Sequence, residues 1–193
     1  MSTTNIMIVG VGGQGTLLAS RILGNALVQE GYDVKVSEVH GMSQRGGSVV
    51  TYVKFGDKVW SPIIGQGEAD IILSFELLEA ERALPYLRPD GQIIVNTQQI
   101  DPMPVITGAA QYPADALEAL TANARVTAVD ALSLAKEAGT SRAVNVVLIG
   151  ILASQTKIPK ERWLDTIRQT VPEKFQAVNL KAFELGYRYA QER

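Results

Sequence analysis

The sequence predicts a three-layer α/β fold, in which a mainly parallel sheet lies between two layers of helices. Three observations support this prediction: an apolar strand runs into a glycine-rich turn, strand-like and helix-like segments alternate through the first two thirds, and the last third is almost wholly helical in pattern. The chain has 193 residues, of which 46% are hydrophobic and 20% charged. This is enough to bury the core of one domain, and we expect a single domain over residues 1–193.

The chain opens with a βαβ pattern. Residues 5–9 form an apolar strand, and a glycine cluster follows it. Apolar residues then recur at helical spacing as far as Gly31, which stands where a helix C-cap belongs. Residues 33–39 alternate apolar and polar side chains, which is typical of a second strand, and we expect the first two strands to be neighbours.

The middle of the chain adds further strands to the parallel core. Residues 48–55 and 59–64 predict a hairpin that turns at Gly56-Asp57. Residues 69–75 and 92–96 predict buried strands, with a helix over 76–87 between them.

The remainder of the chain is mostly helical. The proline-rich residues 98–113 predict a loop with a short strand. A helix over 114–122 and a last strand over 125–129 follow it. From Leu132 onward the periodicity predicts a helical C-terminal third.

The composition excludes several kinds of chemistry. The chain has no cysteine and one histidine, His40. It therefore supplies no cysteine nucleophile, disulfide or iron–sulfur ligand, and we expect no metal site. The net charge of −2, without a basic block, argues against a nucleic-acid partner.

The chain shows no targeting or membrane signal. No basic residue precedes the apolar run at its N-terminus, as a signal peptide would require. Its most hydrophobic stretch, residues 146–153, is too short to cross a bilayer. We therefore expect a cytoplasmic protein with no membrane partner.

The first glycine loop matches G-x-G-x-x-G between a strand and a helix, which is the context of a Rossmann-like phosphate-binding turn. Such glycines let the backbone approach an anion at a helix N-terminus. A nicotinamide enzyme would also use an acid such as Glu38 at the end of the second strand. A P-loop, which would lack its lysine here, and a tight turn without a ligand are the alternatives. The candidate binding residues are Gly10, Gly12, Gly13, Gln14 and Gly15.

A second glycine loop, over residues 40–47, follows the second strand. It gathers four polar side chains, which are His40, Ser43, Gln44 and Arg45. Loops at strand carboxyl ends line the ligand crevice of doubly wound sheets, so this loop should face the first one. Arg45 suits a carboxylate or phosphate, and His40 titrates near neutral pH. A surface loop without a ligand is the alternative.

These two loops carry a family resemblance. Residues 10–16 (Gly-Val-Gly-Gly-Gln-Gly-Thr) and 37–49 (Ser-Glu-Val-His-Gly-Met-Ser-Gln-Arg-Gly-Gly-Ser-Val) resemble the small, gamma-type subunit of 2-oxoacid:ferredoxin oxidoreductases. Residues 145–150 and 179–186 are similar to the same subunit, so the resemblance spans nearly the whole chain. The second loop favours the indolepyruvate branch over the relatives that act on pyruvate or 2-oxoglutarate.

The resemblance implies a function for the assembled enzyme. Such enzymes oxidatively decarboxylate a 2-oxo acid to an acyl-CoA with thiamine diphosphate and Mg²⁺, and they pass electrons through iron–sulfur clusters to ferredoxin. This chain has no cysteine and no Gly-Asp-Gly…Asn-Asn type motif for thiamine diphosphate. The resemblance therefore implies that a larger partner subunit holds these groups, and that this chain alone binds no cofactor and is inactive.

The resemblance also implies roles for the loop residues. His40 and Arg45 would line the active site. The first loop would be a scaffold or, with Ser43 and Gln44, would face CoA or another anion. Two alternatives remain open: a stand-alone, Rossmann-type nucleotide- or NAD(P)-binding protein, and an interaction module that contributes no group to an active site.

Overall fold

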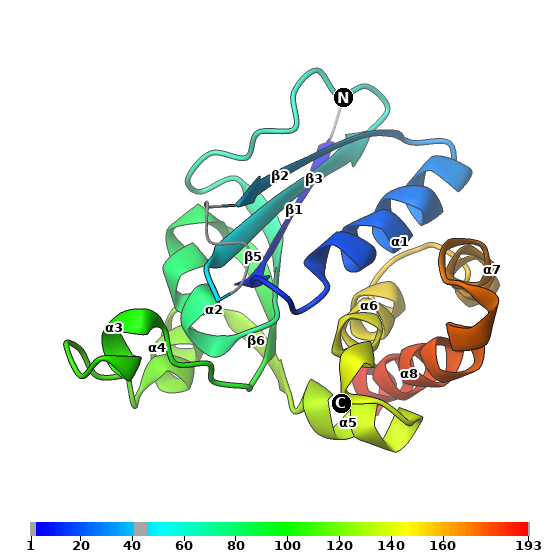
Figure 1. Cartoon of the computed structure of the whole chain (residues 1–193). Helices are drawn as coiled ribbons and strands as arrows, with labels where there is room; N and C mark the ends of the chain where they lie inside the picture. The colour runs from blue at the N-terminus through cyan, green and yellow to red at the C-terminus, as the bar shows by residue number, and fades with distance from the viewer. Residues whose placement is uncertain (1–2, 41–45, 193) are drawn as a thin grey trace.

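The structure is a computed structural model that describes residues 3–40 and 46–192, and it has the predicted three-layer α/β architecture (Figure 1). The sheet has six strands in the order β2-β3-β1-β4-β5-β6. The strands are β1 (Thr3–Val11), β2 (Asp33–His40), β3 (Ser48–Gly56), β4 (Ala69–Ser74), β5 (Leu87–Asn96) and β6 (Arg125–Val129).

The parallel part of the sheet is formed by β1, β4, β5 and β6. β3 is antiparallel to both β1 and β2 and lies between them. The prediction that β1 and β2 are neighbours is therefore wrong. Only seven residues, 41–47, connect β2 to β3. So short a connection joins antiparallel neighbours, because two parallel strands need a longer crossover between them. β3 therefore pairs with β2 and lies between β2 and β1.

The predicted hairpin of 48–55 with 59–64 is also wrong. Residues 48–56 do form β3, but both edges of β3 are already taken by β1 and β2. The second predicted arm, which contains Pro62, instead belongs to an irregular loop over 57–68. Trp60 on this loop is 86% exposed.

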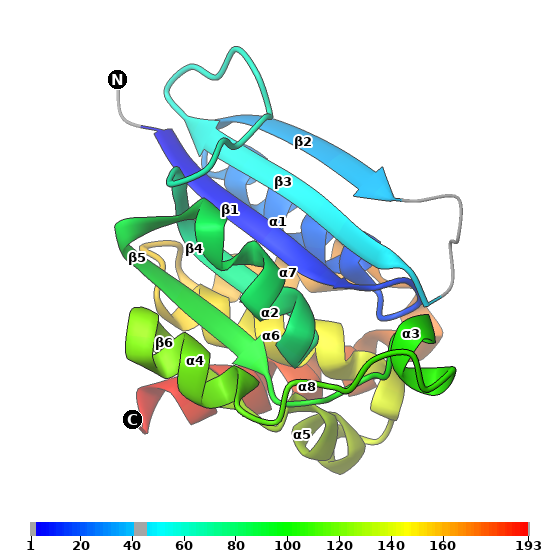
Figure 2. The same cartoon turned by 90° about the vertical axis from the view of Figure 1, so that its left-hand side faces the viewer.

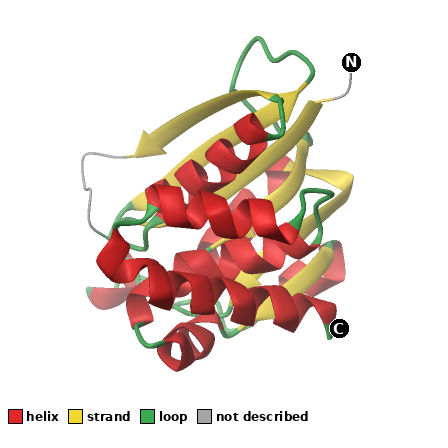
Figure 3. Cartoon of the chain, turned by 90° about the vertical axis from the view of Figure 1, so that its right-hand side faces the viewer, coloured by secondary structure: helices red, strands yellow, loops and turns green. Residues whose placement is uncertain are grey.

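Two layers of helices cover the sheet. The helices are α1 (Thr16–Gln29), α2 (Leu77–Ala83), α3 (Met103–Ile106), α4 (Ala116–Asn123), α5 (Ala131–Ala138), α6 (Val144–Ser154), α7 (Lys160–Thr170) and α8 (Glu173–Gln191). One core lies between the sheet and the layer that contains α1, α5, α6, α7 and α8 (Figure 3). A smaller core lies under α2 and α4 on the opposite face (Figure 2).

The predicted elements of the second half are largely confirmed. The strands over 69–75, 92–96 and 125–129 correspond to β4, β5 and β6. The helix predicted over 76–87 is shorter, because α2 gives way to a 3₁₀ turn at Leu84–Tyr86, where Pro85 lacks a backbone donor. The segment 98–113 holds the single turn α3 and no strand. The helical last third is as predicted, and no helix of the described residues has the length and hydrophobicity of a membrane span.

The helical layer is centred on α6, whose residues 144–153 are all buried. It crosses α8 closely, because both helices carry a glycine at the crossing. A Cβ on Gly186 would lie 2.0 Å from the Val147 carbonyl oxygen, and one on Gly150 would lie 2.3 Å from that of Phe183. Gly150 and Gly186 belong to the stretches 145–150 and 179–186 that carry the family resemblance. At these two positions, the residues of the resemblance are needed for helix packing.

A methyl group at this crossing should destabilise the fold. We predict that Gly186→Ala lowers the stability by about 3 kcal/mol, because backbone would have to move. At this chain length, that corresponds to a fall in Tm of about 6 to 12 °C. Gly24→Ala in α1 is the matched control, since its Cβ would meet only Val36 Cγ2 at 3.7 Å. Equal Tm values for the two variants in a thermal melt would refute the tight crossing.

Candidate functional site

The first glycine loop lies at the carboxyl edge of the sheet, between β1 and α1. Gly13 and Gly15 have φ angles of 103° and 86°, in the left-handed region that favours glycine. A Cβ on Gly10 would lie 2.9 Å from Cβ of Phe75. Apart from Gly13 itself and its two neighbours in the chain, no described residue has an atom within 4 Å of the place where a Cβ of Gly13 would stand. The loop is thus packed on one side and open at Gly13.

Side-chain amides fasten this loop to the sheet. Gln14 Oε1 accepts a hydrogen bond from Val11 N at 2.7 Å, and Gln14 Nε2 donates to the Phe75 carbonyl at 2.9 Å. Asn96, at the end of β5, donates to the same carbonyl at 3.1 Å and accepts from Ala131 N at 3.1 Å. These contacts join the ends of β1, β4 and β5 to the start of α5. Gln14 therefore acts within the chain to position the loop.

The N-terminus of α1 is available to a ligand. Its N-cap, Gly15, provides no capping side chain, and its first turn contains no acidic residue. The Gly15 carbonyl accepts a hydrogen bond of 3.2 Å from Nδ2 of Asn145, a buried residue of α6. The positive end of the helix dipole therefore lies beside the open glycine loop, which favours an anion there.

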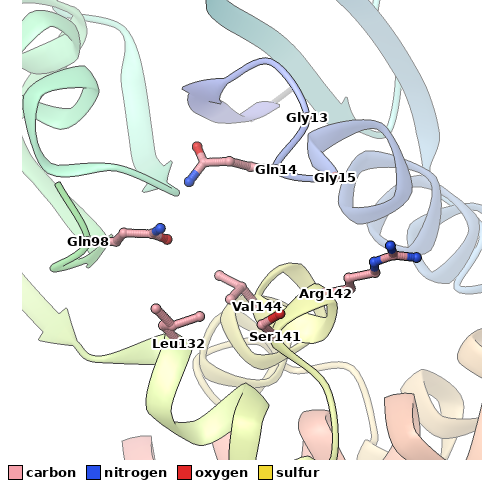
Figure 4. A pocket seen from close by; sticks show the side chains of 8 residues that line it. All are labelled: Gly13, Gln14, Gly15, Gln98, Leu132, Ser141, Arg142 and Val144. Carbon is pink, nitrogen blue, oxygen red and sulfur yellow. The ribbon is translucent and has the colours of Figure 1, made fainter. Parts of the chain in front are cut away.

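A pocket of about 410 Å³ opens at this helix end (Figure 4). Its lining residues come from three connections and from the starts of α5 and α6, and they are Gly13, Gln14, Gly15, Gln98, Leu132, Ser141, Arg142 and Val144. Arg142 is exposed and forms no ion pair with any residue that the structure describes. Its guanidinium lies on the α1 side of the pocket (Figure 4), and the amide of Gln98 and the hydroxyl of Ser141 add further hydrogen-bond donors to the lining.

The sequence analysis missed Ser141, Arg142 and Gln98. Gln98 follows the strand β5, so the rule that loops at strand carboxyl ends line ligand sites could have found it. Ser141 and Arg142 lie in a 3₁₀ turn between two helices, α5 and α6. A connection between helices carries no such signal, and only the packing of α6 under Gly15 brings this turn to the pocket.

The second glycine loop meets the first one, as predicted. Gly12 N donates to the Gly47 carbonyl at 2.8 Å, and Gly46 N donates to the Gly12 carbonyl at 3.3 Å. The contact comes about because β3, rather than β2, lies beside β1. The predicted residues Ser43, Gln44 and Arg45 lie outside the described residues, as does the side chain of His40.

The strand order leaves Glu38 in the wrong place for a nicotinamide site. β3 occupies the position next to β1 that the second strand takes in a dinucleotide-binding fold. Glu38 lies one strand further out and lines a second hollow of about 400 Å³ with Gly12, Thr16 and Val49. Its Oε2 is buried without a hydrogen-bond partner among the described residues. This negative group near the glycine loop disfavours a dinucleotide diphosphate on that side.

A buried carboxylate holds the connection that carries Gln98. Glu76 is only 1% exposed. Its Oε2 accepts from Glu79 N at 2.9 Å, and its Oε1 accepts from Ile100 N at 3.0 Å and from the Tyr112 hydroxyl at 2.5 Å. Burial, followed by this bond to Glu76, raises the pKa of Tyr112 well above its ordinary value. The segment 98–112 is thereby fastened to the N-terminus of α2.

Known proteins are similar to this chain in sequence and in fold. A family model described as pyruvate ferredoxin/flavodoxin oxidoreductase matches residues 5–189. The chain belongs to this family. Indolepyruvate oxidoreductase subunit IorB of Pyrococcus horikoshii is 46% identical, over 100% of this chain and 98% of its own. Subunit IorB of Archaeoglobus fulgidus is 40% identical, over 96% of this chain and 94% of its own. The family resemblance seen in the sequence is thus confirmed.

Solved structures of two other proteins have the same fold. The keto/oxoacid ferredoxin oxidoreductase gamma subunit of Geobacter sulfurreducens has a TM-score of 0.74 and 24% identity, covering 98% of this chain and 99% of its own. A 2-oxoglutarate:ferredoxin oxidoreductase of Magnetococcus marinus, solved with 2-oxoglutarate, coenzyme A and succinyl-CoA bound, has a TM-score of 0.76 and 18% identity. It covers 100% of this chain, which corresponds to 32% of that chain.

Removing the Tyr112 hydroxyl should weaken the fastening of segment 98–112. We predict that Tyr112→Phe costs about 1–3 kcal/mol at neutral pH, because Glu76 loses a donor and Leu78 N its 3.0 Å acceptor. The folded chain keeps the Tyr112 proton above pH 10, whereas the unfolded chain releases it, so wild-type stability falls further as the pH rises.

Tyr112→Phe should lack this additional decline in the free energy of unfolding. Denaturant melts of both proteins at pH 8 and above pH 10 measure the difference. Tyr32→Phe is the control, since the Tyr32 hydroxyl forms no hydrogen bond with the residues described. Identical pH slopes for wild type and Tyr112→Phe would contradict the account.

Proposed function

We propose that this chain is the small subunit of an indolepyruvate:ferredoxin oxidoreductase, and that its 410 Å³ pocket receives the anionic part of coenzyme A. Relatives of near-equal length that are named indolepyruvate oxidoreductase subunits support the first half of the proposal. The second half rests on one observation: the open N-terminus of α1 and Arg142, whose guanidinium forms no ion pair with a described residue, line the same pocket.

The redox chemistry belongs to a larger partner subunit. This chain has no cysteine for an iron–sulfur cluster. Its described residues contain no group of three or more His, Asp and Glu side chains placed to hold a metal ion. Its residues therefore do not fit the clusters or the Mg²⁺–thiamine diphosphate group, which we assign to the partner. The complex would oxidatively decarboxylate an aryl pyruvate and transfer the acyl group to CoA.

The role of this chain is to bind and orient. Phosphate oxygens suit both parts of the pocket, because a guanidinium binds them through two parallel hydrogen bonds and a helix N-terminus adds backbone donors. The contacts of Gln14 and Asn96 fix the glycine loop before a ligand arrives, which lowers the ordering cost of binding. Placing CoA at a fixed position relative to the partner's reacting group is the contribution of this subunit to catalysis.

The test uses the complex assembled with the larger subunit. We predict that Arg142→Ala raises the KM for CoA about ten- to a hundredfold with little change in kcat, as expected for the loss of one charge-assisted contact of about 1.5–3 kcal/mol. Arg142→Lys should recover part of the loss. Arg125→Ala, at an exposed arginine on the far edge of the sheet, is the control and should be neutral.

The same assay tests the second loop. If His40 and Arg45 line the active site, His40→Ala and Arg45→Ala should lower turnover by about ten- to a hundredfold in an intact complex. Failure of these variants to assemble would instead place both residues at the interface. The pocket assignment is wrong if Arg142→Ala assembles and keeps its KM for CoA.

A further inference from the structure

The two edges of the sheet differ in how they are covered. β6 has five residues, and the Tyr189 hydroxyl of α8 donates to its Ala128 carbonyl at 2.8 Å. β2 has eight residues and pairs with β3 along one edge only. Its other edge meets no strand of the described chain (Figure 2). Exposed edges of this length are sites where another chain can add a strand.

A groove runs beside this open edge, between β2 and α1. Its volume is about 370 Å³, and its lining includes Leu17, Arg21, Gly24, Val28, Val34 and Val36. The four α1 residues follow one another at spacings of four, three and four, so they form one stripe along the helix. Leu17, Val28 and Val36 are 48%, 58% and 46% exposed, which is high for large apolar side chains.

The groove has the shape that an added strand requires. Gly24, which has no side chain, leaves room in the middle of the stripe, where Val36 Cγ2 lies 3.7 Å from the position that a Cβ would take. Side chains at every second position of a new strand would point toward the stripe, as those of Val34 and Val36 do. The backbone of β2 supplies the hydrogen bonds, and the apolar groove supplies the specificity.

We propose that an extended segment of the larger partner subunit adds a strand along β2 and places alternate apolar side chains in this groove. This inference rests on the proposed function for the existence of that partner.

The positive charge of Arg21 in the groove indicates that the partner's segment carries an acidic residue. Arg21 lies in the stripe, is exposed, and forms no ion pair with any residue of the described chain. A carboxylate on the added strand would therefore complete the groove. On β2 itself, Lys35 is already paired with Asp33 at 2.5 Å.

A second copy of this chain fits the edge less well. Antiparallel pairing of two β2 strands about a two-fold axis at Val36 would place Val34 opposite Glu38 and Asp33 opposite Val39. No pair of opposite charges would form directly across the two strands. Neither strand would place a carboxylate where it forms an ion pair with Arg21. The partner subunit is therefore the favoured occupant.

Docking at this edge would also place the partner beside the candidate site. β2 ends at His40, where the second glycine loop begins, and the end of that loop is bonded to Gly12. A strand added along β2 would thus bring the partner subunit to the loops for which an active-site role is predicted.

The experiment compares complexes formed with the purified larger subunit, identified by its iron and thiamine diphosphate content. Arg21→Glu should raise the Kd of the complex about tenfold or more, because a carboxylate would face a carboxylate. Val28→Asp should do the same. Arg125→Glu at the opposite edge is the matched control and should bind like the wild type. Thermal melts of the isolated variants check that each is folded.

A photo-reactive residue introduced at position 36 identifies the occupant. We expect it to cross-link to a segment of the larger subunit that has alternating apolar residues and an acidic residue. Wild-type affinity of Arg21→Glu, a cross-link to a helix, or a cross-link to a second copy of this chain would each overturn the inference. If no iron- and thiamine-containing subunit binds even the wild-type chain, it is the proposed function that fails.

Discussion

The carbonyl oxygen of Phe75 is the point on which the geometry of the site depends. It accepts hydrogen bonds from the side-chain amides of Gln14 and Asn96, which come from the ends of two other strands. Each bond contributes about 0.5–1.5 kcal/mol to stability. Their larger effect is positional, because they hold the first glycine loop and the start of α5 against one sheet edge. Together with the bond from Asn145 to the Gly15 carbonyl, they place Gly13 and Gly15 at the mouth of the pocket.

The helical layer completes the site from the other side. α6 is buried along 144–153, and its crossing with α8 at two glycines fixes its position. Its first residues lie under the first glycine loop. Asn145 bonds the Gly15 carbonyl there, and Arg142 stands just before it. A subunit without redox groups can therefore still present a rigid, donor-rich surface to an anionic cosubstrate. In the proposed function, its role in the enzyme is positioning, while oxidation takes place on the partner.

Much of the fold followed from the sequence, and the exceptions have physical reasons. Apolar runs and glycine turns predicted the parallel strands and the helical last third, since these signals are local. The place of β3 was not predictable in this way, because strand order is set by competition for edges. Arg142 was missed because its turn joins two helices, and only long-range packing brings it to Gly15. The first glycine loop was predicted at the correct edge, but Gln14 turned out to use its amide within the chain.

Amide hydrogen exchange of the assembled complex, with and without CoA, tests the central claim most directly. If the pocket at the N-terminus of α1 holds the anionic part of CoA, adding CoA should slow exchange at residues 12–18 and 140–144, and NADH should have no effect there. Exchange in these segments that does not change with CoA, or that slows with NADH instead, would contradict the account.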